Sequence, residues 1–215
     1  MADEKRPYRK RRRAELEAET RRRIAQSAVE LHGTVGPSRT SFSAVAERAG
    51  VRRSTLYRHF PDEAALFAAC SAHWLAANPL PDLASWATIP HPDERLAQAL
   101  EELYAYYRQT DPMLANLLRD EDTVPAVKQQ LRAFRDYLAA ARDILVRGRK
   151  LRGQPRNRVL AATGHALAFC TWRSLTQEQG LDDHQAVELM AALVGASSCS
   201  DRHESRPRAR SAADR

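Results

Sequence analysis

Residues 41–60, SFSAVAERAGVRRSTLYRHF, have the pattern of two short helices joined by a tight turn. Apolar residues recur in the first half at spacings of three and four, at Phe42, Val45, Ala46 and Ala49. This spacing places them on one face of an α-helix. Gly50 follows, and glycine can take the positive φ that ends a helix and reverses the chain. The stretch therefore predicts a helix-turn-helix, in which Ser41 caps the first helix.

The second helix of this pair has an outer face that is rich in hydrogen-bond donors and contains no carboxylate. This face consists of Arg52, Arg53, Ser54, Thr55, Tyr57, Arg58 and His59. A helix of this kind can lie in the major groove of DNA, where an arginine such as Arg53 can bind O6 and N7 of guanine. We therefore expect this helix to read DNA.

Positive charge gathers at the same end of the chain. Residues 1–60 hold 15 of the 34 lysines and arginines but only 7 of the 27 acidic residues, and the whole chain has a net charge of +7. This asymmetry predicts an N-terminal module that binds a polyanion, on a near-neutral body. Residues 1–13 are a block of like charge, which predicts a disordered basic arm. The arm is either a solvated tail or a segment that contacts DNA, and the adjacent helix favours DNA contact.

Hydrophobic periodicity predicts three helices within residues 14–60 and a linker helix over residues 61–77 that opens at Pro61. The three helices would share a core of Ile24, Ala28, Leu31, Phe42, Val45, Ala46, Leu56 and Phe60. Four prolines over residues 78–92 predict a loop with at most a short helical piece.

Helical patterns fill the rest of residues 78–196 and predict a regulatory and dimerisation domain, so the whole chain is expected to be all-α. The predicted helices span residues 93–109, 111–119, 125–147, 156–179 and 183–196. The last two have small residues and wide apolar faces, which suit an isologous contact between two subunits. The alternative is that they are ordinary core helices of a monomer. Residues 197–215 are polar and without periodicity, which predicts a disordered tail.

Other classes of protein find little support in the sequence. No apolar run is long enough to span a membrane, and the charged N-terminus lacks the apolar core of a signal peptide. The three cysteines, at 70, 170 and 199, are widely spaced and predict reduced thiols in a cytoplasmic protein. Cys199 and His203 are too few for a metal site. His165 and Cys170 would point to different sides of one helix, so we expect no enzyme, no cofactor and no metal.

The helix-turn-helix resembles the N-terminal DNA-binding domain of TetR family transcriptional regulators. The resemblance covers residues 20–74 and rests on Thr40-Ser41, Val45-Ala46, Ala49-Gly50-Val51, Thr55-Leu56-Tyr57-Arg58-His59-Phe60 and Leu66. It implies that Ser41, Tyr57 and His59 contact phosphates. It also implies that Arg53, Ser54, Thr55 and Arg58 approach the bases or the flanking phosphates. Tyr57 could instead pack against the first helix of the domain.

Two positions depart from the family pattern. Glu63 stands where these regulators usually have a lysine beside the DNA backbone, and Arg52 stands where a serine or threonine usually caps the recognition helix. The carboxylate of Glu63 favours the N-terminus of its helix electrostatically but removes one phosphate contact. Our hypothesis is that Arg52 and the basic arm compensate for the missing lysine.

The resemblance further implies a homodimeric repressor that binds a palindromic DNA operator and releases it when a small molecule enters the body. Aromatic and polar residues of the body are the candidates for that pocket, namely Trp74, Tyr104, Tyr107, Phe134, Tyr137, His165, Phe169 and Trp172. The alternative is a sequence-tolerant nucleic-acid-binding protein dominated by its basic arm.

Overall fold

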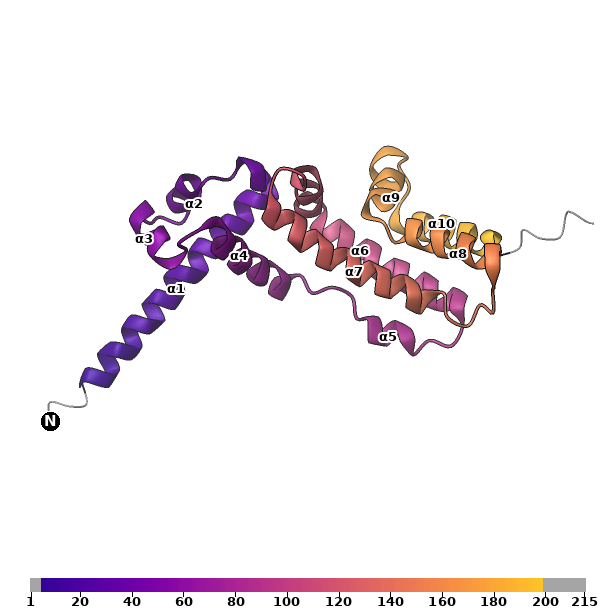
Figure 1. Ribbon diagram of the computed structural model, residues 1–215, viewed down its shortest axis with the longest axis horizontal. Coiled ribbons are helices and arrows are strands. Elements are labelled where there is room, and N and C mark those ends of the chain that lie inside the picture. The colour runs from indigo at the N-terminus through magenta and orange to yellow at the C-terminus, as the bar shows by residue number, and fades with distance from the viewer. Residues whose placement is uncertain (1–4, 199–215) are drawn as a thin grey trace, which may run out of the picture. The chain divides into compact units, whose positions relative to one another are not determined.

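The computed structural model describes residues 5–198, and side chains from residue 8 onward. Within this part the chain forms helices and no strands (Figure 1). The all-α prediction is therefore confirmed. The chain divides into two compact units, the first made of residues up to Leu80 together with Tyr106–Arg135, and the second made of Pro81–Ala105 and the residues from Asp136 onward. The sequence predicts a single boundary after residue 77. The first unit instead ends at Leu80 and also takes in residues 106–135, which pack with the N-terminal helices.

The first unit contains the N-terminal helices α1 (Lys5–Thr34), η1 (Pro37–Arg39), α2 (Phe42–Arg48), α3 (Arg53–His59) and α4 (Glu63–Ala77). Two further helices, α6 (Pro92–Asp120) and α7 (Pro125–Leu145), each contribute a part to both units. The second unit also contains α5 (Leu83–Ala87), α8 (Gly153–Ala166), α9 (Phe169–Arg173), the π-helical turn η2 (Ser174–Glu178) and α10 (Asp183–Ser197). The short helical piece predicted within residues 78–92 is thus present as α5.

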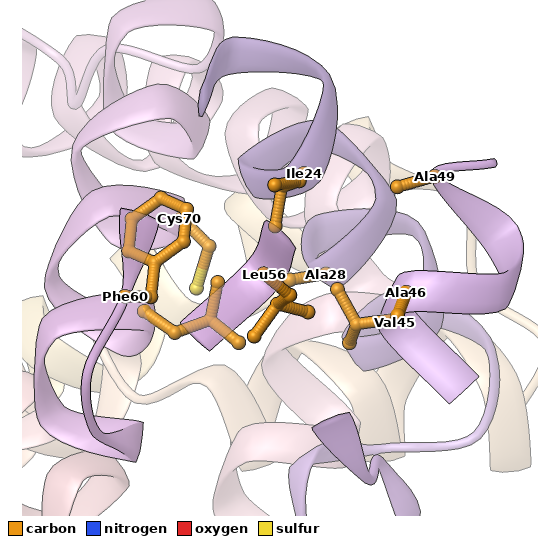
Figure 2. Packing of buried hydrophobic residues seen from close by; sticks show 9 residues of the cluster. Ile24, Ala28, Val45, Ala46, Ala49, Leu56, Phe60 and Cys70 are labelled. Atoms are coloured by element: carbon orange, nitrogen blue, oxygen red, sulfur yellow. The ribbon is translucent and has the colours of Figure 1, made fainter. Parts of the chain in front are cut away.

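The predicted core of the N-terminal domain is confirmed. Side chains from α1 to α4 meet in one cluster, shown in Figure 2, of Ile24, Ala28, Val45, Ala46, Ala49, Leu56, Phe60, Leu66 and Cys70. Leu31 and Phe42 pack at its edge and are partly buried. Removing each large apolar side chain from water contributes about 1.5–3 kcal/mol, so this cluster holds the short helices α2 and α3 in place.

Residues 5–13 are helical, so the prediction of a disordered arm is wrong for them. α1 begins at Lys5 and continues without a break to Thr34. The like charges are offset along the helix surface, because Arg11 pairs with Glu15 at 3.0 Å and Arg13 with Glu17 at 3.1 Å. Each such pair four residues apart stabilises a helix by a few tenths of a kcal/mol. Residues 1–4 and most of the predicted C-terminal tail lie outside the described residues.

Pro61 does not open the fourth helix. α4 starts at Glu63, and Asp62 occupies its N-cap with a side-chain oxygen that accepts a hydrogen bond from the Ala65 amide at 2.8 Å. A capping carboxylate satisfies one orphan amide of the first turn, which Pro61 cannot do.

The predicted break before Pro112 is absent, because α6 runs through this residue as one helix. A proline inside a helix removes one backbone hydrogen bond and costs about 3 kcal/mol. Burial on both sides offsets that cost, since Tyr107 and Thr110 are fully buried and Met113 and Leu114 nearly so. The packing of the buried residues around Pro112 therefore outweighs the helix-breaking tendency of the proline.

The predicted helix over residues 156–179 is broken in two. α8 ends at Ala166, and Ala168 is extended with φ −73° and ψ 133° before α9 begins. Tertiary contacts favour the break, because the Ala166 carbonyl accepts a hydrogen bond from Tyr104 and Phe169 packs against Trp172. No glycine or proline marks this position in the sequence.

Candidate nucleic-acid interface

The turn between α2 and α3 forms as the sequence predicts. Ser41 caps α2 by accepting a hydrogen bond from the Ala44 amide at 3.2 Å. Gly50 takes φ 62°, a left-handed conformation that glycine adopts without strain. Arg52 is the N-cap of α3, and no described side chain caps the helix there. The first amides of α3 therefore remain available to an external anion such as a DNA phosphate.

The predicted DNA-binding residues are brought together on one side of α3. Leu56 and Phe60 are fully buried and fix the inner side of the helix. The outer side presents the exposed residues Arg53, Ser54, Tyr57 and Arg58, with Thr55 and His59 half-buried, and Arg52 is exposed at the N-cap of α3. Ser41 is exposed at the N-cap of α2. This surface carries three arginines and no carboxylate, which matches the negative charge of a DNA backbone.

Tyr57 packs against Phe42 of α2. Its ring lies 5.1 Å from the ring of Phe42, centroid to centroid. The Arg53 guanidinium lies over the same ring at 5.5 Å from its centroid and donates a hydrogen bond to the Tyr57 hydroxyl at 3.2 Å. Tyr57 is still 42% exposed, so it positions Arg53 while its own edge faces solvent.

Arg21 on α1 supports the far end of α3, a role that the sequence did not reveal. Its guanidinium donates to the His59 carbonyl at 2.6 Å and stacks 4.2 Å from the centroid of the Phe60 ring. Burial, and then the charges of Arg58 and Arg21, lower the pKa of His59. The imidazole is therefore neutral at pH 7 and can offer DNA a hydrogen bond but no charge.

Glu63 is exposed in the first turn of α4. This position favours a carboxylate, because helix N-termini carry partial positive charge. A glutamate in place of the usual lysine at position 63 therefore stabilises the start of α4.

Five of the predicted pocket residues lie in the second unit, and several of them contact neighbouring groups of the protein. In the second unit their polar atoms are hydrogen-bonded to neighbouring groups. The Tyr104 hydroxyl donates to the Ala166 carbonyl at 2.8 Å and the Tyr137 hydroxyl to the Pro81 carbonyl at 2.9 Å. The indole of Trp172 donates to Asp183 at 2.9 Å. Phe169 packs against Trp172, and His165 is exposed. That these five residues line a pocket stays a prediction.

A cavity of about 140 Å³ does exist in the first unit, lined by α1, α4, α6 and α7. Of the predicted residues only Trp74 and Phe134 line it, while Tyr107 is buried and contacts the Phe134 ring edge-on at 6.4 Å. Its other walls include Val29, His32, Phe67, Cys70, Met113 and Leu117. A cavity of this size and character can hold a small apolar molecule.

The few polar groups of this cavity are uncharged at neutral pH. His32 Nδ1 lies 3.6 Å from Cys70 Sγ. Burial lowers the pKa of His32 to about 4 and raises the pKa of Cys70 to about 12. Sequence reasoning missed His32, although it lies four residues after Ala28 on the buried stripe of α1, a spacing that could have indicated its burial.

The end of α6 is fastened to the connection between α1 and α2. The Asn116 amide donates to the carbonyls of His32 at 2.9 Å and Gly33 at 3.0 Å, and Arg119 donates to the Val35 carbonyl at 3.0 Å. Asp120 is 4% exposed and accepts a hydrogen bond from the Ser38 amide at 3.0 Å. These contacts, which we call the α6 clasp, join residues more than eighty positions apart in the chain.

Gly36 is required where the clasp closes. It adopts φ 93°, and a Cβ atom there would lie 1.9 Å from the Arg119 guanidinium and 2.6 Å from an Asp120 carboxylate oxygen. Both the left-handed backbone and the close approach exclude a larger residue.

The sequence also raised the pair His165 and Cys170, and the pair Cys199 and His203, as candidates for chemistry. His165 and Cys170 lie on two separate helices, and the nearest polar neighbour of His165 is the Thr171 hydroxyl at 3.3 Å. No group of three histidine, cysteine or acidic side chains in the described part could hold a metal ion. No helix in this part is long and apolar enough to cross a membrane. Cys199 and His203 lie outside it.

Residues 24–70 match the family model of bacterial regulatory proteins of the tetR family. The match spans α2 and α3 and the parts of α1 and α4 that enclose their core. No curated protein sequence matches the chain.

Solved structures extend the likeness to most of the chain. A Clostridium perfringens regulator whose name assigns it to fatty acid metabolism has a TM-score of 0.61 at 13% identity, covering 81% of this chain and 97% of that one. A TetR-like transcriptional regulator from Rhodococcus sp. RHA1 has a TM-score of 0.58 at 19% identity, covering 85% and 97%. The multidrug binding protein EbrR, solved with imidazole, has a TM-score of 0.50 at 19% identity, covering 81% and 89%.

At these identities the solved structures show a shared fold, and the matched helix-turn-helix supplies the DNA-binding element. Residues 24–70 are therefore a helix-turn-helix domain of the kind found in the tetR family of bacterial regulatory proteins, and most of the chain shares the fold of the solved regulators.

Proposed function

We propose that this regulator is a cytoplasmic repressor that binds a palindromic operator as a homodimer and leaves it when a small molecule fills the cavity of the first unit. The observation that carries the proposal is that the cavity and the DNA-binding domain share side chains. Cys70 belongs to the core that supports α3 and also lines the cavity, and Val29 and Phe67 touch both. A molecule in the cavity therefore acts directly on the packing of the DNA-binding helices.

The DNA-bound state follows from the surface of α3. Two copies of this helix, related by a two-fold axis, enter successive major grooves when their centres lie about 34–36 Å apart. Arg53 and Arg58 approach base edges and flanking phosphates, while Ser41 and Tyr57 contact the backbone. Arg52, next to the open amides of α3, supplies the positive charge that a lysine at position 63 would supply in related regulators.

A dimer contact through α8 and α10 is part of the proposal. These two helices pack on one another within the second unit. Met190 and Val194 face inward, whereas Leu189 and Leu193 on the same helix are 40% and 50% exposed. Two exposed leucines one turn apart suit a self-complementary apolar contact.

The ligand that the cavity fits is small, largely apolar and uncharged. Most of its walls are aliphatic or aromatic, and its buried imidazole is neutral, so a charged ligand would lose its hydration without a partner charge. Such a ligand lowers DNA affinity only by as much as it prefers the unbound conformation.

The α6 clasp can link ligand binding in the cavity to the conformation of the helix-turn-helix. Met113 and Leu117 line the cavity, and Asn116 and Asp120 on the same helix hold the segment that leads into α2. A ligand that displaces α6 therefore displaces the start of the helix-turn-helix.

The proposal is tested by a gel-shift titration of labelled DNA from upstream of the chain's own gene, with unlabelled competitor and at two salt concentrations. Indole and toluene then serve as neutral probes of the cavity. We expect preferential binding of that DNA and its release by at least one probe. Equal binding to all duplexes would instead favour the sequence-tolerant alternative, in which charge alone sets affinity.

A cavity-filling variant locates the ligand. Ser71→Leu narrows the cavity from α4 and should abolish probe-induced release while DNA binding persists. Ala68→Leu on the same helix is the matched control, because Ala68 is exposed and does not line the cavity. If both variants still release DNA with the probe, the ligand acts elsewhere.

A further inference from the structure

A second concentration of positive charge lies in the loop between α7 and α8, far in sequence from the DNA-binding helices. Five cations lie within ten residues, at Arg147, Arg149, Lys150, Arg152 and Arg156. The sequence contains no acidic residue from position 144 to position 177. The proposed repressor mechanism makes no use of this loop.

The loop encloses a hollow of about 250 Å³ in the second unit. Four cations line it, namely Arg147, Arg149, Lys150 and Arg156, with the single carboxylate of Asp143. Arg142 already donates two hydrogen bonds to that carboxylate, at 3.1 Å and 2.9 Å. The hollow therefore has a net positive lining.

Two guanidinium groups beside the hollow are buried without full compensation. The Arg149 side chain is 10% exposed and pairs with Asp93 at 2.8 Å, yet its Nε is buried and has no partner among the described residues. Arg95 is 5% exposed and donates to the carbonyls of Ile89 and Arg147, and its Nε is likewise without a partner in the described chain. Burial, and then the charges of Arg149 and Arg147, lower the pKa of Arg95.

The backbone of the loop is shaped as for an anion. Gly148, Lys150 and Gly153 take φ values of 83°, 50° and 62°. Lys150 is the one residue other than glycine with positive φ in the described chain, and such a conformation is strained. α8 begins at Gly153, and Arg152 at its N-cap makes no side-chain hydrogen bond to it within the described residues. Open helix amides next to turns of mixed handedness form concave anion sites.

We propose that this hollow binds the phosphate or pyrophosphate group of a small molecule. Arg147, Arg149, Lys150 and Arg156 supply the positive charge of its lining. The bound anion offsets the mutual repulsion of Arg95, Arg147 and Arg149. The repressor therefore has a second ligand site, specific for anions, apart from the apolar cavity of the first unit.

Pyrophosphate, orthophosphate and ATP are the probes, titrated into the full-length protein by calorimetry at constant ionic strength set with sodium chloride. We expect saturable binding of pyrophosphate with a Kd below about 1 mM. If pyrophosphate and ATP bind equally, the site reads the phosphates alone, and if ATP binds more tightly, it also reads the rest of the nucleotide.

The variant Lys150→Gln/Arg156→Gln should weaken pyrophosphate binding roughly tenfold or more, since charge-assisted hydrogen bonds are lost. Lys128→Gln/Arg132→Gln is the control with the same change of charge on exposed residues of α7, and it should bind as the wild type does.

No saturable binding by the wild type, or equal weakening in both variants, overturns the proposal. If pyrophosphate does not bind but the first variant loses DNA affinity, the hollow contacts DNA phosphates instead. Operator binding is measured in parallel, so that a failure of the repressor proposal can be told apart from a failure of the anion-site proposal.

Discussion

The two units of this chain use their aromatic and polar side chains in different ways. In the first unit, α3 presents its arginines to solvent, and a cavity with uncharged walls lies under the same domain. In the second unit, the polar ends of Tyr104, Tyr137 and Trp172 bind neighbouring groups of the protein. The residues expected to receive a ligand in the second unit therefore have structural contacts as well. The features that can bind an operator and an apolar effector are concentrated in the first unit.

Core substitutions in the two units test this difference most strongly. Leu56→Ala and Leu100→Ala each remove a fully buried side chain, the first beneath α3 and the second in the second unit. Each should destabilise the protein by about 2–5 kcal/mol in urea titrations, because a cavity remains. At a temperature where both variants are folded, only Leu56→Ala should weaken operator binding, by about tenfold or more. An equal loss of DNA affinity in the two variants would show that DNA binding does not depend on the first unit alone.

The pH dependence of stability should report the buried imidazole of the first unit. The pKa of His32 is about 4 in the folded chain and higher in the unfolded chain, so the unfolded state takes up the proton first as pH falls. Stability should therefore be complete above about pH 6.5 and fall by about 3 kcal/mol as pH drops toward 4. Urea midpoints across this range measure the effect. His32→Leu should flatten the profile, and His91→Gln, an exposed control, should leave it as in the wild type. An unchanged slope in His32→Leu contradicts the burial argument.

The α6 clasp is tested by Asp120→Asn, which removes a charge-assisted acceptor from Ser38 and Arg119. We expect a loss of about 1.5–3 kcal/mol at pH 7. The hydrogen bond from Arg119 lowers the pKa of Asp120 to about 2, so the folded state favours the ionised carboxylate. The advantage of the wild type over the variant should persist above about pH 4 and vanish as pH falls toward 2. Asp136→Asn, at an exposed position, is the control, and equal effects of both variants would contradict the role of the clasp.

The smallest effect is expected from Tyr104→Phe in the second unit. The variant loses the hydrogen bond to the Ala166 carbonyl and should be less stable by about 1 kcal/mol. Its response to the cavity probes should match that of the wild type, because Tyr104 does not line the cavity. A changed probe affinity would return this residue to the set of ligand contacts.

The helix-turn-helix was predictable because its signals are local. Apolar spacing, Gly50 and a run of donors all lie within twenty residues, and each has one physical meaning. The α6 clasp and the contact of Arg21 with His59 join distant parts of the chain, and no pattern along the sequence announces them. The cavity is likewise a product of four helices.

Two of the wrong predictions share one cause. Proline and glycine commonly mark helix ends, so the sequence predicts a break at Pro112 and none at Ala168, whereas the structure has the reverse. Packing decided otherwise in both cases, with burial preserving the helix at Pro112 and the hydrogen bond from Tyr104 to the carbonyl of Ala166 favouring the break. Tertiary contacts override local propensity when several buried groups depend on them.

Sequence-specific DNA binding by α3 is tested most directly with Arg53→Ala, measured by gel shift on DNA from upstream of the chain's own gene and on a scrambled duplex of equal length. The wild type should prefer its own DNA by a factor of roughly a thousand or more. The variant should lose about 1–3 kcal/mol on that DNA and much less on the scrambled duplex, because the contact reads a base. Equal weakening on both duplexes, or no preference by the wild type, would contradict the account.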